Sequence, residues 1–74
     1  MNLALIKEGK CCKVLKINLN ERALKRLKEL GIYEGACVRV SRKKNKAFLI
    51  LSVLGVFYAV REKDAKNILV EEYE

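Results

Sequence analysis

The sequence predicts a small, mainly β protein, a partly open barrel of about five short strands with one short helix after the first strand. Three observations lead to this fold class. Most apolar segments are short and rich in β-branched or aromatic residues, which is typical of strands. One segment carries leucines at helical spacing. The chain has 74 residues and neither repeats nor linkers, so we expect a single domain, 1–74.

The first strand and the helix follow each other in the first third of the chain. The segment KCCKVLKINL, 10–19, has the composition of a strand. After it, Leu24, Leu27 and Leu30 recur at helical spacing, which predicts a helix of about ten residues whose leucines pack against the barrel. Asn20 is a suitable N-cap, because its side-chain oxygen can accept a hydrogen bond from the first helical turn.

Two glycines connect the helix to the next strand. Gly31 follows the last periodic leucine, where a left-handed residue ends a helix without a side-chain clash. Gly35 then permits a tight turn into the strand ACVRVSR, 36–42, in which Val38 and Val40 share one face. Both glycines are therefore expected to be structural.

The apolar run 47–60 is expected to form a β-hairpin. Its fourteen residues are fewer than the roughly 20 that a membrane-spanning helix needs, and Gly55 interrupts them. Two strands joined by a turn at Leu54 and Gly55 fit better. The predicted segments of the second half are a charged loop or hairpin end at 41–46, strands at 47–53 and 56–61, a short helical turn at 62–67 and a last strand at 68–72.

Alternation along this hairpin predicts an exposed apolar surface. The residues expected to fill the barrel are Leu49, Leu51, Val53, Tyr58 and Val60. The residues expected to face outward are Phe48, Ile50, Ser52, Leu54 and Phe57. Because contiguous exposed apolar surface marks interaction sites, we interpret Phe48, Ile50, Leu54 and Phe57 as a patch for docking on a partner or for self-association into a homo-oligomer. Two alternatives are that the helix folds over this face, or that the register is shifted by one residue.

The net charge of +7 indicates an acidic partner, which could be nucleic acid, an anionic membrane surface or an acidic protein face. On the helix, Arg22, Lys25 and Arg26 are either a solvated face or electrostatic contacts for an acidic protein surface. The remaining basic cluster consists of Arg39, Arg42, Lys43, Lys44 and Lys46. We interpret this cluster as a solvated loop rather than a nucleic-acid-binding surface, because the aromatic residues that could stack on bases lie in the apolar hairpin.

Few residues of the sequence point to catalysis or to metal binding. The chain has no histidine, and no nucleophile stands out with a base beside it, so we expect no enzyme activity, no catalytic residues and no small-molecule substrate. With Cys12 pointing inward as a core residue, Cys11 and Cys37 would lie on the outer surface. Two such thiolates would suit zinc or copper(I), but incidental surface thiols are the favoured interpretation, and we expect neither a metal nor a cofactor.

The order of motifs resembles a known family. The central pattern L-x-x-L-x-x-L-G-I-x-x-G is formed by Leu24, Leu27, Leu30, Gly31, Ile32 and Gly35. The block RLKELGIYEG at 26–35, followed by AVREKDAKNILV at 59–70, is specific as a pair. In these features the chain resembles ferrous iron transport protein A, FeoA, over nearly its full length.

This resemblance implies an SH3-like barrel and a non-enzymatic cytoplasmic accessory of ferrous iron uptake. Such a protein would dock on the cytosolic part of the FeoB permease, at the inner face of the membrane, and stabilise or regulate it. FeoB would supply nucleotide hydrolysis and the transport path. Similar domains end metal-dependent repressors, but a 74-residue chain with nothing before the barrel favours the transport accessory. The alternative is a metal-responsive or nucleic-acid-binding small barrel.

Overall fold

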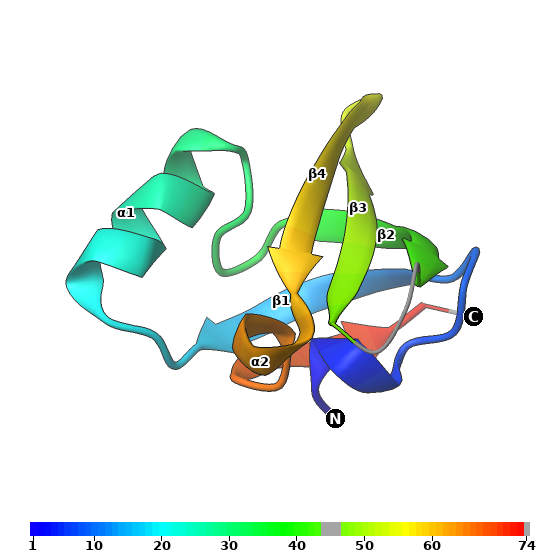
Figure 1. Cartoon of the computed structure of the whole chain (residues 1–74), viewed down its shortest axis with the longest axis horizontal. Coiled ribbons are helices and arrows are strands. Elements are labelled where there is room, and N and C mark those ends of the chain that lie inside the picture. The colour runs from blue at the N-terminus through cyan, green and yellow to red at the C-terminus, as the bar shows by residue number, and fades with distance from the viewer. Residues whose placement is uncertain (44–46, 74) are drawn as a thin grey trace.

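A computed structural model describes residues 1–43 and 47–73, which form one bent antiparallel sheet with short helices around it (Figure 1). The strands are β1 (Cys11–Ile17), β2 (Cys37–Lys43), β3 (Phe48–Val53), β4 (Val56–Arg61) and β5 (Ile68–Glu72). The helices are the 3-10 turn η1 (Leu3–Leu5), α1 (Glu21–Glu29) and α2 (Glu62–Ala65). The predicted fold class is confirmed: the protein is mainly β, with a short helix after the first strand.

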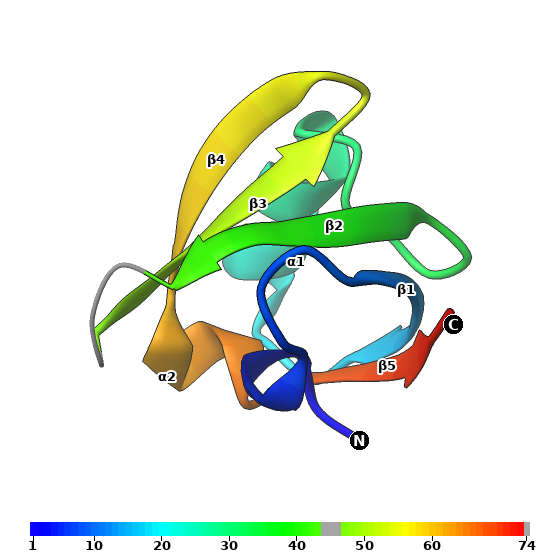
Figure 2. The same cartoon turned by 90° about the vertical axis from the view of Figure 1, so that its right-hand side faces the viewer.

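The strands lie in the order β4-β3-β2-β1-β5, so both ends of the chain meet in the pair β1–β5. Register shifts interrupt β1 between Val14 and Lys16, and β2 between Val40 and Arg42. Such bulges bend a strand and increase its twist. Figure 2 shows the result: β2 runs from the rising hairpin β3–β4 to the pair β1–β5, and the sheet curls around its own inner face.

The core occupies this inner face, as the alternation predicts. Val38 and Val40 of β2 are buried, and so are Leu49 and Leu51 of β3. The segment before β1 also contributes: η1 and the residue after it bury Leu3 and Ile6 completely. No helix or strand is predicted for this segment from the sequence. The remaining buried residues with large side chains are Val14, Ile17, Leu27, Ile32, Val53, Val60, Ile68 and Val70.

The ends of α1 are those the sequence predicts. The Asn20 side-chain oxygen accepts a hydrogen bond of 2.9 Å from the Ala23 N–H, which caps the helix. After the helix, Gly31 has a φ of +88°, and Gly35 has a φ of +93° before β2 begins. Both lie in the left-handed region that glycine adopts without strain, so these two residues fix how the chain leaves α1.

Two expectations need correction. β2 reaches Lys43, one residue past the predicted strand 36–42, so residues 41–43 do not belong to the charged loop predicted at 41–46; residues 44–46 lie outside the described residues. The Lys43 backbone N–H donates to Glu8 Oε2 at 2.7 Å and its Nζ donates to the Ala4 carbonyl at 2.8 Å, so this end of the strand is held by the N-terminal segment. On α1, Leu27 is buried, whereas Leu24 and Leu30 are only partly buried against the core.

Candidate functional site

The hairpin β3–β4 projects from the barrel on a tight turn. Leu54 and Gly55 have φ values of +51° and +83°, and two positive φ values in a two-residue loop are typical of a type I′ turn. Val53 stands opposite Val56, and Ser52 opposite Phe57. This register places the side chain of Phe57 on the same outer face as Ser52.

The predicted outward residues form what we call the apolar hairpin face: Phe48, Ile50, Leu54 and Phe57. Phe57 is 62% exposed and Leu54, at the tip, is 96% exposed. Phe48 is also exposed, and Ile50 is half-buried. Val56, next to the turn, is exposed too, but it stands opposite Val53 and therefore lies on the other side of the hairpin from Phe57.

The burial of the inner residues excludes a shifted register. Val53 and Val60 are buried, and Tyr58 is partly buried and packs against the core. The helix does not cover the apolar hairpin face either, since Phe57 stays exposed. Figure 1 shows α1 beside β4 rather than over the outer face of the hairpin.

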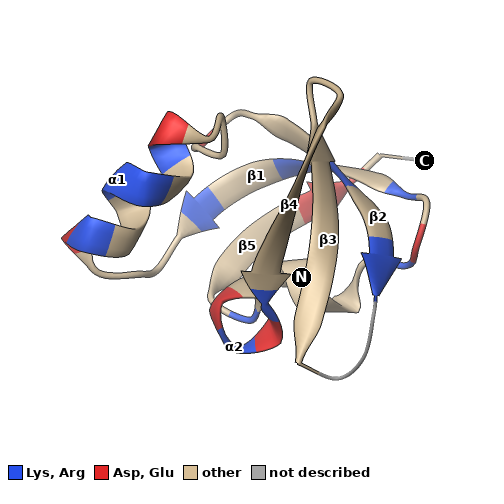
Figure 3. Ribbon diagram, turned by 45° about the horizontal axis from the view of Figure 1, so that its top comes forward, with Lys and Arg blue, Asp and Glu red and all other residues tan. Residues whose placement is uncertain are grey.

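A groove of about 1000 Å³ lies between α1 and β4. Leu27 and Leu30 line it from the helix, and Tyr58 and Val60 line it from the strand. The predicted basic residues Arg22, Lys25 and Arg26 also line this groove, together with Phe48, Ala59 and Arg61. Figure 3 shows α1 carrying much of the positive charge on this side, while the hairpin is almost free of charge. The structure therefore brings the basic helix next to the hairpin.

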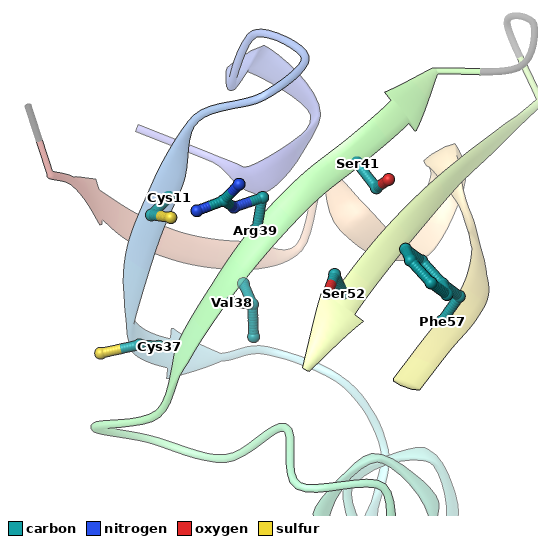
Figure 4. Close-up of a pocket in the computed structure, with 7 residues that line it drawn as sticks. All are labelled: Cys11, Cys37, Val38, Arg39, Ser41, Ser52 and Phe57. Carbon is teal, nitrogen blue, oxygen red and sulfur yellow. The ribbon is translucent and has the colours of Figure 1, made fainter. Parts of the chain in front are cut away.

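The cysteines separate as expected into one inner and two outer residues. Cys12 is completely buried, and this burial is the main cause that raises the pKa of its thiol from 9.0 to about 11. Cys11 and Cys37 line a second pocket, of about 370 Å³, with Arg39 and Phe57 on the outer face (Figure 4).

The two outer thiols do not converge. In Figure 4 the Cys37 thiol points away from the other lining side chains. Cys37 Sγ lies 3.1 Å from the hydroxyl oxygen of Tyr73, and this hydrogen bond is the main cause that raises the pKa of Tyr73. In residues 1–43 and 47–73, no three potential ligands among Cys, Asp and Glu gather as a metal site would require. Within the same residues, each helix is too short or too polar to cross a lipid bilayer.

Comparison with known proteins identifies a family and several solved structures that are similar to this chain. Residues 1–72 match the family model of the FeoA domain. No curated protein sequence matches the chain. A FeoA protein from Chlorobium tepidum superposes with a TM-score of 0.93 at 24% identity, covering 100% of this chain and 71% of that one. At 24% identity this structural similarity is evidence for the fold alone.

Two further structures are slightly more similar in sequence. One is described as an iron uptake regulatory protein, FeoA, with a TM-score of 0.88 and 25% identity over 99% of this chain and 97% of the other. The second is FeoA from Stenotrophomonas maltophilia, complexed with zinc, with a TM-score of 0.80 and 26% identity over 96% of this chain and 89% of the other. That protein is described as an SH3 domain protein and as a candidate ferrous iron transport activating factor.

Proposed function

The chain belongs to the FeoA domain family, and on this premise we propose that it is a non-enzymatic accessory of ferrous iron uptake that docks on the cytosolic part of a FeoB permease. Two structural relatives are described in terms that support an accessory role, one as an iron uptake regulatory protein and one as a ferrous iron transport activating factor. Docking would stabilise or regulate the permease from the inner face of the membrane.

The exposed apolar hairpin face is the observation that carries this proposal. Phe57 is 62% exposed and Leu54 is 96% exposed, on a hairpin that projects from the barrel. Covering apolar surface supplies about 25 cal/mol per Å², before the costs of association. Because aromatic anchors contribute much of the energy of protein interfaces, Phe57 is the residue on which we expect docking to depend most.

The basic residues of α1 are suited to steering the encounter. Arg22, Lys25 and Arg26 are all exposed and lie next to the hairpin. Complementary charge raises the association rate more than it raises the affinity, and salt screens it. We therefore expect the association rate with the permease to fall as ionic strength increases, while the dissociation rate changes little.

A titration against the cognate FeoB permease in nanodiscs tests the proposal at physiological salt, with and without guanine nucleotide. Saturable binding of the labelled protein is expected. The substitution Phe57→Asp should weaken it at least about tenfold, because it removes a large apolar contact and adds a charge that the interface must desolvate.

Leu5→Asp is the matched control. Leu5 is 61% exposed, almost the same as Phe57, but it lies in η1 at the other end of the barrel. This variant should bind like the wild type, and circular dichroism should show that both variants stay folded. Absence of binding by the wild type, or an equal loss in both variants, would contradict docking through the apolar hairpin face.

A further inference from the structure

The outer edge of β4 is unpaired in the described part of the chain. The sheet order ends at β4, which has β3 as its single neighbouring strand. In a type I′ turn the residues flanking the two central ones form a hydrogen-bonded pair, and such pairs alternate along the hairpin. Val56, Tyr58 and Val60 therefore pair with β3. The backbone N–H and C=O groups of Phe57 and Ala59 point toward the free edge.

This edge lacks the usual protection against pairing with another chain. Natural edge strands carry lysines, prolines or bulges that prevent it. In β4 the residues from Val56 to Val60 are uncharged and include no proline, and their register with β3 is continuous. The α1 helix stands beside the edge, and a helix cannot supply the backbone partners of a strand.

The groove between α1 and β4 has the size and lining of a peptide site. Its volume of about 1000 Å³ is at the upper end of the range of ligand pockets. Tyr58 and Val60 line one wall, and Leu27 and Leu30 line the other. An extended segment in this groove would pair with the backbone of β4 and place alternate side chains against the helix.

Charge identifies the kind of segment that fits. Four basic residues line the groove, against two acidic ones, Glu29 and Asp64; the basic residues are Arg22, Lys25, Arg26 and Arg61. An acidic segment would be attracted, whereas a second copy of this chain would bring the same basic rim and a net charge of +7. We propose that the groove binds an extended acidic peptide segment, which adds as a further strand to the edge of β4.

This inference concerns the groove and the edge of β4, which share Phe48 with the apolar hairpin face, and it does not depend on the permease as partner. The probe is an eight-residue peptide that alternates glutamate with valine, with both ends blocked. Its binding is followed by fluorescence anisotropy, and amide hydrogen exchange is measured by NMR on the intact chain. Binding should slow exchange at the Phe57 and Ala59 amides at least about tenfold, because they gain backbone acceptors.

Two control peptides separate backbone pairing from charge. The same peptide methylated at every backbone nitrogen should lose binding, because it cannot donate hydrogen bonds. A version with lysine in place of glutamate should bind at least about tenfold more weakly. If no binding of the first peptide is seen at about 1 mM, or if binding leaves exchange at Phe57 and Ala59 unchanged, the proposal is wrong.

Variants of the protein test the two components separately. Ala59→Pro removes an edge donor without breaking a bond to β3, and proline is tolerated at such edge positions. It should abolish peptide binding while the circular dichroism spectrum is retained. The pair Arg22→Glu and Arg26→Glu should weaken binding about tenfold, and the control pair Lys7→Glu and Lys10→Glu, whose residues are also exposed, should not.

Light scattering tests whether a second copy of this chain, rather than a peptide, pairs with the edge of β4. If the wild type forms a dimer that Ala59→Pro converts to a monomer, and the peptide does not bind, a second copy occupies the edge and the acidic-peptide proposal is refuted. If the Ala59→Pro protein fails to fold, the charge pair and the exchange measurement on the wild type still decide the outcome.

Discussion

Replacing Gly31 with alanine should destabilise the protein more than the same change at Gly35. Both glycines have a strongly positive φ, so an alanine at either site adopts a left-handed conformation that costs about 1–2 kcal/mol, partly offset by about 0.4–1 kcal/mol from a less flexible unfolded chain. At Gly31 a Cβ would also lie 3.3 Å from Val53 Cγ1, whereas at Gly35 nothing lies within 4 Å. Val53 is buried and has little room to move, so this contact adds about 1 kcal/mol or more.

The expected losses are about 0.5–1 kcal/mol for Gly35→Ala and about 2 kcal/mol for Gly31→Ala. Urea unfolding followed by far-ultraviolet circular dichroism measures both, since the chain has no tryptophan. The double variant Gly31→Ala, Val53→Ala should lose about 1 kcal/mol less stability than the sum of the losses in the two single variants, because the truncated valine relieves the contact. Equal losses at the two glycines, or strictly additive losses in the double variant, would refute this reasoning.

Three more predictions concern the helix cap, the buried thiol and the core. Asn20→Ala should lower stability by about 1 kcal/mol, seen as a lower urea midpoint, because the Ala23 N–H loses its acceptor; an unchanged midpoint would contradict the cap. Because the pKa of Cys12 is raised to about 11 in the folded protein, its neutral thiol contributes fully to stability below pH 9, where the thiol is neutral in both the folded and the unfolded state. This contribution is lost as pH rises toward about 11, because the thiol ionises first in the unfolded chain. The stability difference between wild type and Cys12→Ala should therefore shrink by up to about 2–3 kcal/mol over that range, and a constant difference would count against it. Leu51→Ala should cost about 2–5 kcal/mol in urea unfolding, while Leu15→Ala, on the exposed face of β1, should cost less than about 0.5 kcal/mol; similar costs would contradict the assigned core.

The strands and the orientation of their side chains could be predicted because one face of each strand is buried. Alternating burial leaves a period of two in the sequence, as in Leu49, Leu51 and Val53. The 3-10 turn η1 could not be found in this way, because three residues are too few to show a period. The last residue of β2 was missed for another reason: Lys43 resembles a loop residue by its charge, yet it pairs with Leu49 of β3.

The candidate site was predictable only in part. The outward position of Phe57 follows from alternation and from the turn at Gly55, both of which are local features. The groove depends on how far α1 stands from β4, and these elements are separated by β2 and β3 in the sequence. A leucine stripe such as Leu24, Leu27 and Leu30 shows that a helix has a buried side, but it does not show which element that side meets. Their uneven burial follows from the tertiary arrangement alone.

During synthesis on a ribosome, β1 emerges long before β5, its neighbour in the sheet. Val14 stands opposite Val70, so this part of the sheet is incomplete until the last residues of the chain are available. At 5–20 residues per second, the interval between the ends of the two strands is about 3–11 s. Throughout it, the apolar side of β1 lacks its partner, next to an unpaired edge on which nascent chains could aggregate. Lys10, Lys13 and Lys16, which stay on the surface of the finished barrel, are placed to keep the growing chain soluble during that interval.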